Sequence, residues 1–244
     1  MKITPYLLPG QREHDSILIF PGGGYEHLSL QKEGADVAAA FNREGFSAFV
    51  AEYRVSPYRY PAILDDAVRA VRTVRHKIGK NSRLALMGFS AGGHLALMEA
   101  QHWQEIQSGN DEISRENGRP DALILCYPVV TFHDPYAHSG SRMNFLGPEN
   151  AGSAEWIDRF SAEKHISTDF PPAFLWHCES DRSVPKENSL MLQQALDAAE
   201  IPNKMLLFPG GAHGLGLAPN EPEISRWFPE CVTWLKGLFA QRSA

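Results

Sequence analysis

The chain has 244 residues, 43% of them hydrophobic and 21% charged, which is enough apolar material for the core of one domain spanning residues 1–244. A net charge of −6 argues against a nucleic-acid-binding surface, and no apolar run is long enough to cross a membrane. Three cysteines without a C-x-x-C pair, and an N-terminus without an apolar leader, predict a cytoplasmic protein without disulfide bonds.

Short apolar runs alternate with helix-forming stretches along the chain. Residues 1–15 predict a preliminary strand or arm. Further strands are expected at residues 16–20, 46–52, 83–87, 122–127, 173–178 and 204–208. Helices are expected at residues 32–44, 62–80, 93–104, 185–200 and 223–240, with a short one near 154–160 inside the irregular segment 128–172. This alternation predicts an α/β fold with a mostly parallel central sheet and helices on both faces.

In such sheets ligands bind at the carboxyl ends of the strands. The segments that follow strands should therefore form the active side of the protein, namely residues 21–32, 53–61, 128–172, 179–185 and 209–222. Residues 105–120 follow a helix instead, so we expect their charges to form a solvated surface at the opposite end.

Residues 88–92 read Gly-Phe-Ser-Ala-Gly, a G-x-S-x-G element between a predicted strand and a predicted helix. A serine on such a turn is held in strained backbone geometry with its hydroxyl pointing out of the sheet. The glycines let the chain bend without a Cβ clash, and free N–H groups of the next helix can stabilise negative charge. This context favours a catalytic nucleophile at Ser90 over a chance match in a glycine-rich turn.

A serine hydroxyl needs a base to take its proton and an acid to orient that base, in the chain order Ser, Asp or Glu, His. Of the ten histidines, only His213 follows the last predicted strand, in a glycine-rich loop that can carry an imidazole over the sheet. Asp181 opens a turn after the preceding strand and is the candidate acid, with Glu179 in reserve. His94 lies one helical turn beyond Ser90, where we expect it to pack beneath the turn.

The negative oxygen of a tetrahedral intermediate requires backbone N–H donors. One is expected from Ala91, the residue after the nucleophile, and others from the loop after the first predicted parallel strand, where Gly23 and Gly24 are the best candidates. The sequence has no H-E-x-x-H motif, no zinc-type Cys/His spacing and no P-loop, so we expect neither a metal nor a cofactor.

Taken together, these motifs resemble the α/β-hydrolase superfamily, in particular compact esterases akin to hormone-sensitive lipase and the carbohydrate acetylesterases. Residues 21–25, Pro-Gly-Gly-Gly-Tyr, are similar to the H-G-G-G loop of these enzymes, with proline in place of the leading histidine. Residues 53–57, Tyr-Arg-Val-Ser-Pro, and the Pro-Ala pair at 61–62 followed by Asp65 and Asp66 look like their Y-R-x-x-P…P-A-x-x-x-D block. The resemblance implies the α/β-hydrolase fold with little or no cap domain.

The same resemblance assigns the roles of nucleophile, acid and base to Ser90, Asp181 and His213. Residues 140–147 and 187–190 look like the branch that acts on acetylated xylo-oligosaccharides and similar sugar esters. Candidate substrate-binding residues are Tyr25, Tyr58, Arg142 and Asn144, with Tyr60 and Trp156 as further aromatic side chains that can stack on a sugar.

The leading hypothesis is a serine carboxylesterase that hydrolyses small acyl esters, foremost acetyl esters and including those of carbohydrates, through an acyl-enzyme on Ser90. A small-molecule amidase, formamidase or peptidase with the same triad is the alternative, since amide and ester hydrolysis share the tetrahedral intermediate. A non-catalytic binding module on the same scaffold is the minor alternative. The sequence leaves open the acyl and alcohol groups and whether the chain forms a homodimer.

Overall fold

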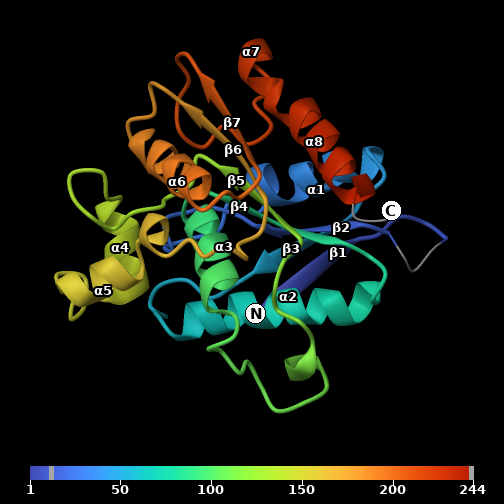
Figure 1. The fold of residues 1–244 in the computed structure, drawn as a ribbon, viewed down its shortest axis with the longest axis horizontal. Coiled ribbons are helices and arrows are strands. Elements are labelled where there is room, and N and C mark those ends of the chain that lie inside the picture. The colour runs from blue at the N-terminus through green and yellow to red at the C-terminus, as the bar shows by residue number, and fades with distance from the viewer. Residues whose placement is uncertain (11–13, 242–244) are drawn as a thin grey trace.

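The computed structural model describes residues 1–10 and 14–241, and one seven-stranded sheet runs through that part of the chain (Figure 1). Its strands are β1 (Lys2–Tyr6), β2 (Ser16–Phe20), β3 (Ser47–Glu52), β4 (Leu84–Phe89), β5 (Ala122–Cys126), β6 (Ala173–Cys178) and β7 (Asn203–Phe208). They are ordered β1-β3-β2-β4-β5-β6-β7, with β1 antiparallel to β3 and the other neighbouring pairs parallel. The predicted α/β fold and its six main strands are confirmed, and β1 is the expected preliminary strand.

Helices connect the strands and cover the sheet. They are the π-helical turn η1 (Gln31–Ala35), α1 (Asp36–Arg43), α2 (Ala62–Ile78), α3 (Ala91–His102), the 3₁₀ turn η2 (Ile113–Arg115), α4 (Ser139–Leu146), α5 (Ala154–Arg159), the 3₁₀ turn η3 (Ala162–Lys164), α6 (Glu187–Ala198), α7 (Pro222–Ser225) and α8 (Trp227–Gln241). A helix occurs at each predicted position, with small shifts at its ends, although the first begins as the π-helical turn η1 and the last is divided in two.

The sheet separates two hydrophobic cores, as the side chains of β2 illustrate. Ile17 and Ile19 pack into the core beneath α1 and α8, whereas Leu18 and Phe20 pack into the core beneath α2, α3 and α6 (Figure 1). Every residue of β2 is buried because both faces of the sheet are covered. The central strands therefore read as continuous apolar runs rather than alternating ones.

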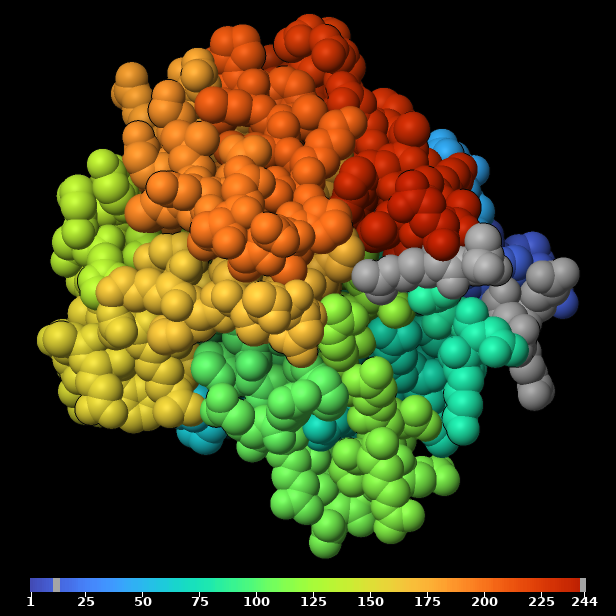
Figure 2. Space-filling view, in the orientation of Figure 1, coloured from blue at the N-terminus to red at the C-terminus, as the bar shows by residue number. Residues whose placement is uncertain are grey.

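The segment between β5 and β6 contains one helix that the sequence does not predict. Residues 139–146, which form α4, include a glycine and several weak helix formers, so their intrinsic helix preference is low. The helix is stabilised by the His138 side chain, which accepts the Ser141 N–H at its first turn, and by burial of Phe145 in the core. α4 and α5 lie at one end of the molecule, at the left of Figures 1 and 2.

The closing helix, predicted as one piece over residues 223–240, is divided into α7 and α8. Pro229 lies in the first turn of α8, where its missing N–H requires no intrahelical partner. The same missing N–H cannot bond the carbonyl of Ser225, so one continuous helix through this point is disfavoured.

Residues 105–120 follow α3 and project from the molecule at the bottom of Figures 1 and 2. Arg83 and Asp121 precede β4 and β5, and a pocket lies where these two strands begin. The segments after β2, β4, β6 and β7 lie at the other edge of the sheet, where the strands end, and these segments carry the candidate catalytic residues.

Candidate active site

Ser90 lies between β4 and α3 in a backbone conformation with φ 53° and ψ −119°, which L-residues rarely adopt. The flanking glycines make this bend possible. A Cβ on Gly88 would lie 2.2 Å from the carbonyl oxygen of Gly92, and a Cβ on Gly92 would lie 2.2 Å from that of Phe20. Since both contacts are with backbone atoms, no side-chain rotation could relieve them. The glycines of the G-x-S-x-G element are therefore required by the packing of this turn.

The structure brings together the three residues predicted as nucleophile, base and acid. His213 Nε2 lies 2.8 Å from Ser90 Oγ, and His213 Nδ1 lies 2.6 Å from Asp181 Oδ2. With the imidazole proton on Nδ1 and donated to Asp181, Nε2 is free to accept the proton of the serine hydroxyl. The reserve acid, Glu179, does not reach His213 and instead lies 3.6 Å from the Lys186 ammonium.

The carboxylate of Asp181 is buried and held by several donors. Its Oδ1 accepts the N–H groups of Ser183 and Val184 at 2.9 and 3.0 Å. Burial by itself would raise the pKa of Asp181, but hydrogen bonds from His177 and His213 outweigh it and hold the pKa well below its usual range. Asp181 is therefore ionised wherever His213 can act as a base.

His177 is a partner of the acid that the sequence did not reveal, because its position inside β6 is typical of a packed strand residue. Its Nε2 lies 2.9 Å from the Val184 carbonyl and 3.4 Å from Asp181 Oδ2, and its Nδ1 lies 2.8 Å from Ser189 Oγ. The Nε2–H donates to the Val184 carbonyl, and the same nitrogen lies close enough to the Asp181 carboxylate to interact with it electrostatically.

The loop after β2, residues 21–25, is called the glycine loop below. Gly23 has φ 133°, and a Cβ there would lie 2.1 Å from the His27 carbonyl oxygen, so only glycine fits. Gly24 has φ 64°, and the nearest atom to a Cβ there would lie at 3.8 Å, an ordinary contact distance. Within the part of the chain that the structure describes, no protein acceptor bonds the N–H groups of Gly23, Gly24 or Ala91. These N–H groups are thus available to a ligand beside Ser90.

Tyr25 corrects one prediction. It was expected to stack on a substrate, but its side chain is fully buried in the core and its hydroxyl lies 2.8 Å from His94 Nδ1. His94 packs beneath the nucleophile turn, as expected, and its Nε2 donates to the Phe160 carbonyl at 2.9 Å. Tyr25 therefore packs beneath the site and does not line its surface, because its positive φ of 58° turns the ring inward.

The other candidate substrate-binding residues lie near the surface, and their binding role stays a prediction. Tyr58 is 53% exposed, with the Arg54 guanidinium 5.5 Å from its ring centre. Arg142 donates to the Phe132 carbonyl at 2.7 Å, and Asn144 donates to the Gly24 carbonyl at 2.9 Å. Asn144 thereby anchors the glycine loop to α4. The two further aromatic candidates pack against Phe160 and against each other: Tyr60 and Trp156.

His138 stands beside the glycine loop and is a better candidate for contact with substrate. A Cβ on Gly24 would lie 3.8 Å from His138 Cε1. Its Nδ1 accepts the Ser141 N–H at 3.1 Å, so the neutral ring carries its proton on Nε2. Burial lowers the pKa of His138, and the nearby His213 lowers it further. A neutral N–H donor thus lies next to the catalytic base.

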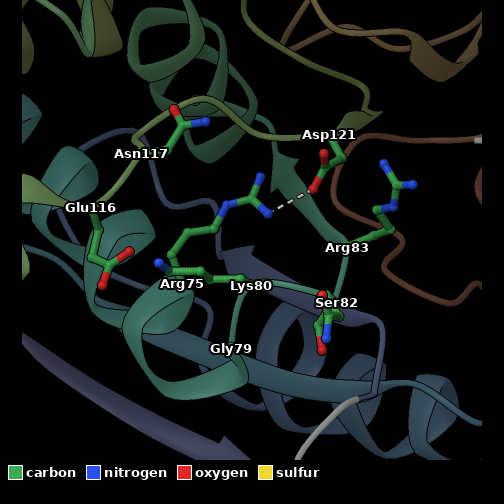
Figure 3. A pocket seen from close by; sticks show the side chains of 9 residues that line it. Arg75, Gly79, Lys80, Ser82, Arg83, Glu116, Asn117 and Asp121 are labelled. Carbon is green, nitrogen blue, oxygen red and sulfur yellow. Dashed lines mark ion pairs between the residues drawn. The ribbon is translucent and has the colours of Figure 1, made fainter.

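The pocket at the opposite end of the sheet has a volume of about 580 Å³ and is not part of this constellation (Figure 3). Arg75 forms an ion pair of 2.7 Å with Asp121, whose carboxylate also accepts the Leu84 N–H at 2.8 Å. These bonds tie α2 to the start of β4, so Arg75 and Asp121 have a structural role.

Residues 1–10 and 14–241 hold neither a candidate metal centre nor a candidate membrane span. No group of three or more His, Cys, Asp or Glu side chains in these ranges is placed to hold a metal ion. Each helix in the same ranges is too short or too polar to span a membrane.

Residues 6–196 match the BD-FAE protein family, which covers most of the chain. The chain belongs to the BD-FAE family. The resemblance to α/β hydrolases stated from the sequence motifs, including the carbohydrate acetylesterase branch, is thereby confirmed.

This BD-FAE member is similar to two curated proteins along nearly its whole length. Endo-1,4-beta-xylanase B of Butyrivibrio fibrisolvens is 37% identical over 232 residues, which are 91% of this chain and 35% of that protein. Acetylxylan esterase of Xylanibacter ruminicola is 29% identical over 242 residues, 96% of this chain and 48% of that protein. The chain thus spans about a third of the length of the first relative and about half of the second.

A solved structure with a similar fold is that of an acetyl ester-xyloside bifunctional hydrolase from Caldicellulosiruptor lactoaceticus. It superposes with a TM-score of 0.89 at 38% sequence identity. The match covers 97% of this chain and 87% of that one, so the glycine loop, the nucleophile turn and the loops that carry Asp181 and His213 fall within a shared architecture.

Proposed function

We propose that this BD-FAE member is a serine carboxylesterase that removes small acyl groups, acetyl above all, from carbohydrate esters. The observation that carries the proposal is the continuous chain of hydrogen bonds from Ser90 through His213 to Asp181. The substrate class is supported by relatives named acetylxylan esterase and acetyl ester-xyloside bifunctional hydrolase.

In the acylation step, Ser90 Oγ attacks the carbonyl carbon of the ester while His213 Nε2 takes the hydroxyl proton. The carboxylate of Asp181 keeps the Nδ1–H in place and stabilises the imidazolium that results. The imidazolium then gives its proton to the departing sugar oxygen, and the acyl group remains on Ser90. A water that loses its proton to His213 releases the carboxylic acid and restores the serine.

The negative oxygen of each tetrahedral intermediate would accept the N–H groups of Gly23, Gly24 and Ala91, which bond no other part of the described protein. The Nε2–H of His138 is suited to donate to an oxygen of the alcohol, since this ring stands beside the glycine loop. These groups suit acyl transfer, whereas cleavage of a glycosidic bond uses two carboxylates that flank it. We therefore propose that this protein cleaves the ester bond, and not the glycosidic bonds of xylosides or xylan to which the names of some relatives refer.

The test is the turnover of p-nitrophenyl acetate and of acetylated xylobiose by the wild type and by Ser90→Ala. Loss of several orders of magnitude is expected, because triad members act as a unit. A fluorophosphonate should label the wild type at Ser90 and leave the variant unlabelled. Turnover retained by the variant would remove Ser90 from the mechanism.

A panel of substrates then decides the acyl group and separates the esterase from the amidase alternative. Acetyl, butyryl and feruloyl esters of one sugar are compared with an N-formyl anilide at equal concentration. The proposal requires the acetyl ester to have the highest kcat/KM. Preference for the anilide would favour the amidase.

We also propose that the protein works in the cytoplasm. Cys126, Cys178 and Cys231 are all buried free thiols, which suits a reducing compartment. Formation of a homodimer stays a prediction, and light scattering after size-exclusion chromatography measures it.

A further inference from the structure

Glu33 is a buried glutamate within the π-helical turn η1, which follows the glycine loop. Only 4% of its surface is exposed, and it forms no ion pair with any Lys, Arg or His of the described ranges. Burying a carboxylate without a cation is costly, so a role beyond ordinary packing has to be sought for it.

The two donors to this carboxylate lead to two different loops of the candidate site. Oε2 accepts the N–H of Gly22, in the glycine loop, at 2.8 Å. Oε1 accepts the Tyr127 hydroxyl at 2.7 Å, and that hydroxyl accepts the N–H of Gly216 at 2.9 Å. Gly216 lies three residues beyond His213, in the segment of residues 209–216 that is called the histidine loop below. One carboxylate therefore connects the glycine loop to the histidine loop.

The carboxylate of Glu33 lies close to Ser90 and His213, but outside the space that a substrate would occupy. A Cβ on Gly22 would lie 2.8 Å from Glu33 Oε2 and 3.0 Å from Ser90 Cβ. A Cβ on Gly214 would lie 4.0 Å from Glu33 Oε1. The ring of Tyr127 packs edge-on against the imidazole of His213, with 4.9 Å between ring centres. Glu33 and Tyr127 thus pack beneath Ser90 and His213.

The hydrogen bonds around Glu33 are those of a carboxylate that acts only as an acceptor. One oxygen receives the N–H of Gly22 and the other receives the O–H of Tyr127, so both act as acceptors. Burial raises the pKa of Tyr127, and the negative charge of Glu33 raises it further, so the phenol keeps the proton that it donates.

We propose that Glu33 is a positioning residue that locks the glycine loop and the histidine loop into one rigid unit, and that its charge stabilises the imidazolium of His213. The proposal rests on the serine esterase function proposed above. A proline stands where related loops carry a histidine, and here Glu33 and Tyr53, whose hydroxyl donates to the Pro21 carbonyl at 2.5 Å, hold that loop from below.

The charge of Glu33 has a consequence for the dependence of activity on pH. The titratable or charged groups that face His213 from the neighbouring elements are Asp181, Tyr127, His138 and Glu33, with the exposed Lys32 nearby. Of these, Asp181 and Glu33 are the two negative charges that favour the protonated imidazole. Removing one of them should make the imidazolium of His213 less favourable and move the acid limb of the kcat/KM profile to lower pH.

The experiment compares Glu33→Gln, Tyr127→Phe and the control Glu99→Gln, with p-nitrophenyl acetate as substrate. The control also replaces a fully buried glutamate side chain, but in the second half of α3 away from Ser90. In Glu33→Gln, one of the two loop bonds is lost and so is the charge, so kcat should fall roughly 10²-fold and the acid limb should move to lower pH. In Tyr127→Phe, kcat should fall about tenfold while the acid limb stays, because the charge remains.

KM should change little in both variants, since neither side chain faces the substrate, and the control should keep the kcat and acid limb of the wild type. Glu33→Gln with an unmoved acid limb, or with kcat within about twofold of the wild type, would overturn the proposal. If Glu33→Gln does not fold, a kcat of Tyr127→Phe within about twofold of the wild type would overturn it. A wild type that neither turns over esters nor binds the fluorophosphonate would instead contradict the esterase function.

Discussion

The two glycines proposed as neighbouring oxyanion donors should respond to the same substitution to very different extents. In Gly23→Ala, the new Cβ would lie 2.1 Å from the His27 carbonyl oxygen, more than an ångström inside normal contact. The His27 oxygen belongs to the backbone and the Cβ is fixed directly to it, so no side-chain rotation can relieve the contact and the glycine loop itself has to move. In Gly24→Ala, the nearest atom to the new Cβ is His138 Cε1 at 3.8 Å, which is ordinary contact.

The magnitudes follow from this geometry. Displacing one oxyanion donor costs about 10²–10³ in kcat, or about 3–4 kcal/mol of transition-state stabilisation. The φ of 133° at Gly23 adds about 1–3 kcal/mol of strain to the folded state of Gly23→Ala. For Gly24→Ala, a cost of about 1–2 kcal/mol for a left-handed residue is offset by about 0.4–1 kcal/mol from the stiffer unfolded chain. Its net destabilisation is therefore about 0–1.5 kcal/mol, and its N–H stays in place.

The assay measures kcat on p-nitrophenyl acetate and the midpoint of urea unfolding for both variants. Gly23→Ala should lose both activity and stability, while Gly24→Ala should keep kcat within about tenfold of the wild type. The reasoning is refuted if Gly23→Ala matches the wild type in both measurements, or if Gly24→Ala has the lower kcat of the two.

Three further substitutions probe the catalytic acid and two buried polar groups of the core. Asp181→Asn should lower kcat about 10³–10⁴-fold, because the amide N–H₂ would favour the wrong tautomer of His213, and a loss below tenfold would contradict this role. The depressed pKa of Asp181 contributes stability above its unfolded pKa of about 3.9, which should be lost as the pH falls below that value and be absent in the variant. Burial raises the pKa of Glu99, so unfolding titrations from pH 5 to 8 should show the wild type losing stability relative to Glu99→Gln, by at most about 1.4 kcal/mol per pH unit. Tyr25→Phe should cost about 1–3 kcal/mol of unfolding free energy, since His94 Nδ1 loses its donor in the core, and an unchanged urea midpoint would argue against that hydrogen bond.

The sequence predicted the sheet and the grouping of Ser90, Asp181 and His213 because those features depend on local patterns and on chain order. Apolar runs between helix-forming stretches identify the strands, and the rule on carboxyl ends places loops distant in sequence at one edge. The stacking role expected of Tyr25 was wrong because the direction of a side chain in a turn with positive φ depends on the fold around it. α4 was missed for a related reason, since its first turn depends on His138, a side chain that precedes the helix.

The buried position and the proposed role of Glu33 could not be predicted from the sequence. An acidic residue near a helix start is typical of a solvated first turn, where its negative charge interacts favourably with the helix dipole. Here the chain forms a π-helical turn instead, with the N–H of Ala35 bonded to the carbonyl of Leu30 at 2.8 Å. The extra residue in that turn changes which side chains face inward, and it buries Glu33 beneath the glycine loop. Such turns are frequent at functional sites, and this one places a carboxylate where neither a regular helix nor its sequence pattern would put it.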